Sequence, residues 1–246
     1  MSNVTAVIFA GGSGVRMGAG KPKQFLEVNG RPIIIHTLEV FENHPAVDSI
    51  VVSCKEDYIE KLNKLLRRFD ISKVKAVVPG ADTGMGSIYN GLRAAKDLCG
   101  FDDDTIVLIH DGVRPCFSGR LIDEVIEAVE AKGRAATCTP MYETPVVSEA
   151  GEIVERTPAR SVCYTAQAPQ GYRLGEVIAA HDEVRKENPG YTGIVDNCTL
   201  MTGLGKEVAI VKGPRSNIKV TTPEDLYIFK AMLEYRETRD ALGLDV

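Results

Sequence analysis

The segment Val4-Thr5-Ala6-Val7-Ile8-Phe9-Ala10-Gly11-Gly12-Ser13-Gly14 decides the fold class. Residues 4–9 form an apolar, β-branched run, which is typical of a strand that is buried on both faces of a sheet. The glycines that follow permit a tight turn in which successive backbone N–H groups point at one ligand. The segment therefore predicts a buried opening strand that ends at an anion-binding loop.

Strand and helix patterns alternate along most of the chain. Apolar runs predict strands at residues 48–53, 73–78, 105–110 and 208–212. Helical spacing of apolar residues predicts helices at 33–42, 56–69, 87–98, 121–131, 174–187, 197–202 and 223–239. This order predicts a Rossmann-like α/β fold, with a mostly parallel sheet flanked by helices. Ligands then bind outside the carboxyl ends of the strands, so the loops after Phe9, Val78 and His110 are the ones to inspect.

The alternation stops at residues 135–162. There Thr, Val and Tyr alternate with polar residues, prolines interrupt the pattern, and residues 149–151 resemble a turn. We predict that this segment is an antiparallel arm projecting from the main sheet. Its exposed edges would need cover, which a second subunit can supply, so a homodimer through residues 135–162 is expected.

Composition excludes several classes of protein. The 246 residues are 44% hydrophobic and 26% charged, with a net charge of −5. A nucleic-acid-binding protein would normally carry a basic excess, and no apolar run reaches the roughly 18 to 20 residues that span a bilayer. The first residues lack the pattern of a signal peptide. We therefore expect a cytoplasmic protein that binds neither nucleic acid nor membrane.

Cysteine and histidine patterns do not indicate a structural metal site. The six cysteines are scattered singly and form no C-x-x-C pair, so we expect reduced thiols that mostly serve in packing. The four histidines, at positions 36, 44, 110 and 181, have no metal-binding spacing.

The glycine-rich loop is locally basic in an acidic chain. Residues 10–26 contain Arg16, Lys21 and Lys23 and no acid. Such a local positive charge beside an anion-binding turn favours a polyphosphate ligand. Two common motifs fail here, because Met17 stands where G-x-G-x-x-G needs its last glycine and Lys21 is followed by Pro22 instead of Ser or Thr. The alternative is a glycine turn with solvated cations.

Three further segments carry possible chemistry, each beside a plain structural alternative. Asp111 follows an expected strand, where it can bind Mg²⁺ on a triphosphate or form a structural ion pair with Arg114. Asp82 and Ser87 flank a helix start, where they can recognise a base or ribose or cap the helix. Lys219 is placed on a short strand, as a ligand or as an exposed edge charge.

Taken together, these segments resemble the cytidylyltransferases that form CDP-polyols from ribitol 5-phosphate or 2-C-methyl-erythritol 4-phosphate. The ordered motifs are A-G-G-x-G-x-R-M from Ala10, P-K-Q-F-L from Pro22, H-D-x-x-R-P from His110 and N-I-K-V-T from Asn217. Sugar-1-phosphate nucleotidylyltransferases share the first motif, but here all four occur in order. The resemblance implies one nucleotidyltransferase domain over residues 1–240, arm included, and a tail at 241–246.

The resemblance also implies roles for individual residues. The cytidine and phosphates of CTP would be held by Ala10, Gly11, Gly12, Ser13, Gly14, Asp82 and Ser87. Arg16, Lys23 and Lys219 would be catalytic and act on the transferring phosphate, while Asp111 would lie beside the nucleotide and bind Mg²⁺. Arg160 of the arm would reach the acceptor phosphate in the partner subunit, and Val195 would lie in the acceptor site. Replacing Arg16 or Lys23 with alanine is expected to lower kcat by roughly 10² or more.

The sequence departs from the family pattern mainly on the acceptor side. The family usually has Thr where Val195 stands, commonly Thr at Ala168, and Arg at Gly84. Phe9, Phe25 and the Gly112-Val113 pair are similar to the ribitol branch, so the expected acceptor is D-ribitol 5-phosphate. The alternative is 2-C-methyl-D-erythritol 4-phosphate, as in isoprenoid biosynthesis. Two other classes stay open: an NAD(P)-dependent oxidoreductase and a catalytically silent nucleotide-binding protein.

Overall fold

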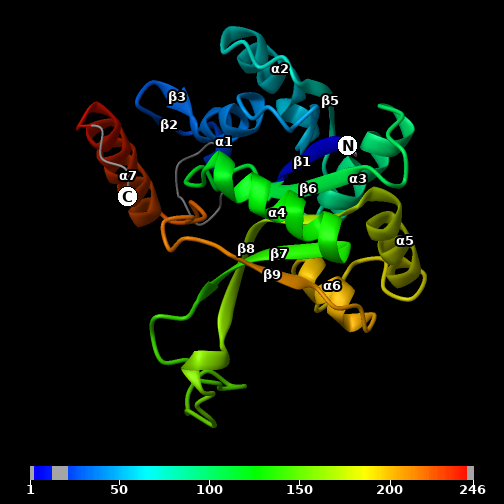
Figure 1. The fold of residues 1–246 in the computed structure, drawn as a ribbon, viewed down its shortest axis with the longest axis vertical. Coiled ribbons are helices and arrows are strands. Elements are labelled where there is room, and N and C mark those ends of the chain that lie inside the picture. Colours follow the sequence, from blue (N-terminus) through cyan, green and yellow to red (C-terminus); the bar gives the residue numbers. More distant parts are fainter. Residues whose placement is uncertain (1–2, 13–21, 243–246) are drawn as a thin grey trace.

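The computed structural model of the chain describes the backbone of residues 3–12 and 22–242, and the side chains of these residues as far as 239. Its centre is a seven-stranded sheet in the order β5-β4-β1-β6-β8-β7-β9 (Figure 1). The strands are β1 (Val4–Ala10), β4 (Ser49–Cys54), β5 (Val74–Pro79), β6 (Ile106–Asp111), β7 (Arg134–Pro140), β8 (Tyr164–Arg173) and β9 (Ala209–Lys212). β8 runs antiparallel to β6 and β7, and the other neighbours are parallel. The predicted mostly parallel sheet is confirmed.

Helices cover both faces of this sheet. They are α1 (Ile33–Glu42), α2 (Ile59–Arg68), α3 (Gly84–Asp97), α4 (Gly119–Lys132), α5 (Leu174–Arg185), α6 (Asn197–Gly203) and α7 (Pro223–Leu242). Side chains alternate along β1, so Ala6 and Ile8 pack with α1, α2 and α4, whereas Val7 packs with α3, α5 and α6. A small hairpin of β2 (Glu27–Val28) and β3 (Arg31–Pro32) precedes α1. No helix within the described residues is long and apolar enough to cross a bilayer.

The projecting arm is shorter than the segment that breaks the sequence pattern. Residues 135–140 belong to β7 and stay in the main sheet, so the arm proper is residues 141–163, which extend below the sheet in Figure 1. Its hairpin closes through one antiparallel bridge between Val147 and Arg156. Several large apolar side chains on it are exposed, namely Tyr142, Val146, Ile153, Val154 and Val162.

Strand β8 was not predicted, because Pro169 and Gly171 look like strand breakers in the sequence. The neighbouring strands β6 and β7 pair with both of its edges. Gly171 is needed there, since a Cβ atom would lie 2.6 Å from Val129 Cγ2 and 2.7 Å from Val125 Cγ1 of α4. Tertiary packing thus overrides the local preference.

Helix α5 contains a fully buried histidine. His181 is 0% exposed, and burial lowers its pKa from 6.5 to about 4, although the hydrogen bond with Asn197 acts to raise it. The folded chain therefore binds a proton at this ring less readily than the unfolded chain does.

We expect the free energy of unfolding of the protein to fall as pH decreases from 6.5 toward about 4. The contribution of neutral His181 is fully present above pH 6.5, the ordinary pKa, and is lost as pH falls toward the folded value of about 4. Between pH 7 and pH 5 the loss is roughly 2 kcal/mol. Urea unfolding at both pH values checks this, with His181→Gln as the control that removes the titrating group. Equal pH dependence in the two proteins would contradict the assignment.

Candidate active site

The carboxyl ends of β1, β4, β5 and β6 open onto one cavity of about 640 Å³. These four strands are neighbours in the sheet, so the loops that leave them meet at one edge. The cavity is lined by Phe9, Ala10, Gly11, Gly12, Lys23, Gln24, Lys55, Glu56, Asp57, Gly80, Ala81, Asp82, Thr83, Gly84, Ser87, Asp111, Val113 and Lys219. It therefore collects most of the residues that the sequence assigns to a nucleotide.

Close packing shapes the wall between the first loop and the loop after β5. A Cβ atom at Gly11 would lie 2.8 Å from Ser87 Oγ, and one at Gly80 would lie 2.9 Å from it. Ser87 Oγ accepts a hydrogen bond from Ala81 N at 2.9 Å and donates one to Thr83 O at 3.0 Å. The Ser87 hydroxyl therefore holds the loop, and the two glycines make room for it.

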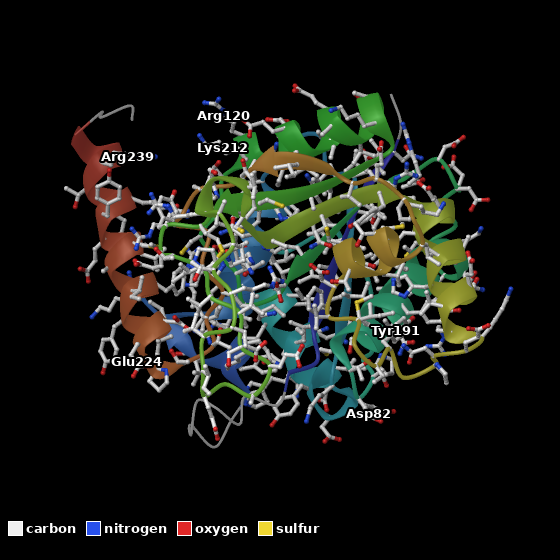
Figure 2. All side chains as sticks on the ribbon, turned by 90° about the horizontal axis from the view of Figure 1, so that it is seen from below. Asp82, Arg120, Tyr191, Lys212, Glu224 and Arg239 are labelled. Atoms are coloured by element: carbon white, nitrogen blue, oxygen red, sulfur yellow. The ribbon has the colours of Figure 1, made fainter. Side chains whose placement is uncertain are left out.

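Neither Asp82 nor Ser87 caps the following helix, so the capping alternative for them is wrong. Thr83 is the N-cap, because its Oγ1 accepts the backbone N–H of Gly86 at 3.0 Å. This cap also explains why α3 begins at Gly84, earlier than predicted. Asp82 is exposed and lies at the outer rim of the molecule in Figure 2, beside the cavity mouth.

The floor of the cavity carries a buried carboxylate between two cations. Asp111 is 6% exposed. Lys219 Nζ contacts its Oδ1, and Arg114 Nε lies 3.4 Å from its Oδ2. Burial raises the pKa of Asp111, whereas Lys219 and Arg114 lower it. The lowering effects together are larger, so the pKa of this carboxyl lies below its ordinary value. The carboxylate is therefore ionised at neutral pH.

Arg114 also fixes the segment that carries Lys219. Its guanidinium donates to the backbone carbonyl of Asn217, and Val220 N donates to Val113 O at 2.8 Å. The expected short strand at Lys219 is wrong: residues 213–222 form no strand, and isolated backbone bonds and side-chain contacts hold them instead. The ion pair is thus both a structural brace and part of the cavity wall.

Lys23 adds a second ammonium group to the same wall. It lies on a 3-10 turn (Lys23–Phe25) and is only 8% exposed. Its Nζ donates to Val220 O at 2.9 Å, so the segment at 219–220 anchors it. Gln24 Nε2 donates to Ala10 O at 2.6 Å and ties the turn to the end of β1. These contacts preorganise positive charge facing the loop after β1.

A second cavity of about 290 Å³ adjoins the first. Both cavities are lined by Phe9, Gly84, Asp111 and Lys219. The remaining lining of the second one comes from Ile88, Ile109, Arg114, Ala166, Gln167, Ala168, Gln170, Val195, Asp196 and Asn197. Val195 is 82% exposed, so its methyl groups stand free at this cavity. The carboxylate and ammonium pair therefore lies where two ligands can meet.

One predicted residue lies outside the cavities, and three others cannot be placed relative to them. Arg160 lies on a 3-10 turn (Arg160–Val162) in the arm and donates to Tyr142 O at 3.0 Å, and neither cavity includes it. Ser13, Gly14 and Arg16 lie outside the described residues. Their predicted roles stay predictions.

The residues present fit a magnesium ion that is bound mainly through a nucleotide. Within residues 3–12 and 22–239, no three or more His, Cys, Asp or Glu side chains gather as a metal site. Asp111 offers a single ionised carboxylate on the cavity floor. Mg²⁺ in nucleotide sites uses one or two carboxylates plus phosphate oxygens and waters, so one carboxylate suffices.

Part of the cavity lining is not predicted from the sequence. Lys55, Glu56 and Asp57 follow β4 and line the first cavity, while Gln170 and Asp196 line the second. The loop after β4 could have been found, because the carboxyl end of every parallel strand faces the same edge. Gln170 lies on β8 and Asp196 is the N-cap of α6, so neither follows a parallel strand, and the strand-end rule does not find them.

Comparisons with known proteins agree on one family. A family model described as 2-C-methyl-D-erythritol 4-phosphate cytidylyltransferase (IspD) matches residues 4–235. A ribitol-5-phosphate cytidylyltransferase of Streptococcus agalactiae serotype V is 45% identical, over 99% of this chain and 100% of that protein. A 2-C-methyl-D-erythritol 4-phosphate cytidylyltransferase of Geotalea uraniireducens is 40% identical, over 94% and 97%.

Solved structures agree with the fold. The crystal structure of 4-diphosphocytidyl-2C-methyl-D-erythritol synthase from Anaerococcus prevotii is 26% identical with a TM-score of 0.79, over 95% of this chain and 96% of that one. The Francisella tularensis 2-C-methyl-D-erythritol 4-phosphate cytidylyltransferase is 29% identical with a TM-score of 0.78, over 94% and 100%.

Proposed function

Because the chain belongs to the 2-C-methyl-D-erythritol 4-phosphate cytidylyltransferase family, we propose that it transfers the cytidylyl group of CTP to D-ribitol 5-phosphate and releases pyrophosphate. The observation that carries this proposal is the pair of adjoining cavities that share Asp111 and Lys219. A transferase must bring two substrates to one reacting atom, and two adjoining cavities with Asp111 and Lys219 in their shared lining support this proposal.

The proposed reaction is an in-line displacement. A phosphate oxygen of the acceptor attacks the α-phosphorus of CTP and forms the new P–O bond, while the bond between the α-phosphorus and its bridging oxygen breaks and pyrophosphate leaves. The acceptor phosphate is already ionised, so no general base is required. The protein positions both substrates and stabilises the negative charge that accumulates around phosphorus.

The cations of the first cavity supply that stabilisation. Lys23 and Lys219 both line the first cavity, where Lys23 Nζ donates to Val220 O and Lys219 Nζ contacts Asp111 Oδ1. The backbone of residues 10–12 offers amide groups at the same place. We assign Mg²⁺ as the metal, held by Asp111 and the triphosphate of CTP, where it would neutralise phosphate charge when bound.

The choice of acceptor rests on sequence similarity and on one detail of packing. Four relatives named for ribitol 5-phosphate are 45–46% identical, against 40% for the methylerythritol enzyme above, and a fifth, from Lacticaseibacillus paracasei, is 37% identical. A Cβ atom at Gly112 would lie 3.1 Å from the Ala10 Cβ and 3.4 Å from Phe9 O. The alanine that the methylerythritol branch often carries there would crowd the carboxyl end of β1. The second candidate acceptor is 2-C-methyl-D-erythritol 4-phosphate, because the matching family model and the Geotalea uraniireducens relative are both named for it.

A direct assay distinguishes the two acceptors. The protein is incubated with CTP, Mg²⁺ and each polyol phosphate, pyrophosphate release is followed, and the nucleotide product is identified by mass spectrometry. We expect kcat/KM for ribitol 5-phosphate to exceed that for the methylerythritol phosphate by at least about tenfold, the equivalent of 1.4 kcal/mol. The reverse order would assign the protein to the methylerythritol branch. Tight CTP binding without product from either acceptor would indicate a silent nucleotide-binding protein.

We also propose that the protein is a homodimer in which the arm of residues 141–163 serves the partner. The arm carries exposed apolar side chains and leaves the body of its own subunit (Figure 1). Arg160 is exposed on this arm and outside both cavities, as expected of a group that acts on the acceptor phosphate of the partner.

A cytoplasmic location is consistent with all six cysteines being free thiols.

Mixing two inactive variants tests this arrangement. Asp111→Asn damages the cavity floor and Arg160→Ala damages the arm, so each homodimer should be nearly inactive. After subunit exchange, hybrid dimers contain one site with both defects and one intact site. We expect the equimolar mixture to regain about a quarter of wild-type activity. A mixture no more active than its components, although sedimentation shows subunit exchange, would place Arg160 in its own subunit's chemistry or outside it altogether.

A further inference from the structure

The second cavity adjoins a loop that a buried histidine holds at its middle and just beyond its end. After α5, residues 186–194 form an irregular connection that leads into Val195, Asp196 and the start of α6. Val195, Asp196 and Asn197 line the second cavity. His181 on α5 contacts Tyr191 in the middle of this connection and Asn197 just beyond it.

Both ring nitrogens of His181 are engaged. Nε2 lies 2.8 Å from Asn197 Oδ1, and Nδ1 lies 2.6 Å from the Tyr191 hydroxyl. A carbonyl oxygen only accepts, so Nε2 carries the proton and donates it, and Nδ1 accepts from Tyr191. The neutral ring thus makes one donated and one accepted hydrogen bond, and all three side chains are buried.

The backbone of the loop is strained at Tyr191, the residue whose hydroxyl contacts His181. Tyr191 has φ +57, a left-handed conformation that is costly for a bulky residue. Its ring packs edge-on against His181 at 5.3 Å, and its backbone N–H donates to Asn188 O at 3.1 Å. Figure 2 shows Tyr191 on the loop beside α5. Such a conformation persists only where its surroundings impose it.

The other side of the cavity segment is fixed from the sheet. Asp196 Oδ2 accepts Gln170 Nε2 of β8 at 3.0 Å, and Asp196 Oδ1 accepts Thr199 N at 2.8 Å as the N-cap of α6. Gln170 Oε1 in turn accepts the Tyr172 hydroxyl at 3.2 Å. The segment is therefore clamped between β8 and α5, and His181 provides the α5 half of the clamp.

We propose that His181 is a positioning residue for the acceptor: through Asn197 and Tyr191 it holds residues 195–197 at the second cavity. This inference rests on the proposed function for the identity of the ligand in that cavity. His181 touches neither cavity and is not a catalytic residue.

The decisive comparison is between His181→Asn and His181→Gln. Glutamine places an amide nitrogen near the position of Nε2 and can still donate to Asn197, whereas the shorter asparagine cannot reach it. We expect His181→Asn to raise KM for ribitol 5-phosphate about tenfold, with KM for CTP within twofold, because one buried hydrogen bond is worth about this much. His181→Gln keeps the hydrogen bond to Asn197 but loses the one with the Tyr191 hydroxyl, so we expect its KM for ribitol 5-phosphate to lie between those of wild type and His181→Asn, with KM for CTP within twofold.

Matched controls separate positioning from general destabilisation. Tyr89 stacks on the same ring at 5.6 Å, but its hydroxyl donates to Asp182 instead of the loop. Tyr89→Phe should leave both KM values unchanged. Tyr191→Phe, which keeps the ring and removes only the hydroxyl, should raise KM for the acceptor and not for CTP. It also serves if His181→Asn fails to fold. Equal changes in both KM values, or none in His181→Asn and Tyr191→Phe, would overturn the proposal.

Hydrogen exchange provides a readout that needs no turnover. Backbone amides of residues 194–200 should exchange faster in His181→Asn than in His181→Gln, while those of β1 and β6 stay equal. If the wild-type protein turns over neither polyol phosphate, the proposed function fails, and the exchange comparison still decides whether His181 holds the loop. Equal exchange at 194–200 in the two variants would refute the positioning role.

Discussion

Replacing Asp111 with asparagine lowers kcat by about 10²- to 10³-fold, the range found when a preorganised electrostatic group is removed from an active site. The buried carboxylate lies between Lys219 and Arg114, so the neutral amide leaves two cations facing each other. Lys219 then loses the partner that holds its ammonium group in the cavity, and the one carboxylate proposed for Mg²⁺ is gone. Steady-state kinetics with CTP and ribitol 5-phosphate over a range of Mg²⁺ concentrations measure the effect.

The same chemical change at the surface is the control. Asp97 pairs with Arg93 on the exposed side of α3, and Asp97→Asn should leave turnover unchanged. Because breaking a buried pair also destabilises a protein by about 3–5 kcal/mol, thermal unfolding of both variants must accompany the kinetics. A folded Asp111→Asn protein that turns over within threefold of wild type would remove Asp111 from the mechanism.

Replacing Lys23 with methionine lowers kcat by about 10²-fold with little change in fold. Methionine keeps most of the length of the buried lysine stem but removes the charge, so it separates electrostatics from packing. The ammonium group is held by Val220 O at 2.9 Å in the cavity wall, where the proposed chemistry places negative charge around phosphorus. Single-turnover rates at saturating CTP measure the chemical step.

Lys61 is the matched control for this experiment. Lys61 lies on α2, outside both cavities, and its ammonium group is 4.9 Å from the centroid of the Phe25 ring. Lys61→Met should keep wild-type rates, and Lys23→Arg should recover part of the loss in Lys23→Met. A single-turnover rate in Lys23→Met close to that of Lys61→Met would show that the charge at position 23 is not used.

Local sequence patterns predict the first half of the chain well. The run Val4–Phe9 and the helix Ile33–Glu42 combine strong periodicity with clear boundaries, and the structure places β1 and α1 there. Prediction fails at β8, where Pro169 and Gly171 are tolerated because β6 and β7 pair on either side. Strand pairing between distant segments is not encoded in any one window of sequence.

The functional site likewise contains residues that local sequence patterns predict and contacts that they do not. Residues 10–12, Lys23 and Asp111 could be predicted because they follow buried strands or carry charge in an unusual place. The contact of Lys219 with Asp111 could not, since it depends on a loop that docks without regular structure. The clamp on residues 195–197 is likewise invisible in sequence, because His181, Asn197 and Gln170 come from three separate elements.

The hydrogen bond from Lys23 to Val220 joins segments near the two ends of the chain, 197 residues apart in sequence. During synthesis, the glycine-rich loop emerges from the ribosome long before the segment that anchors its lysine. A nascent chain therefore has no finished nucleotide pocket until residue 220 has been synthesised, and fragments that stop short of residue 220 should fail to retain CTP even if their sheet has formed.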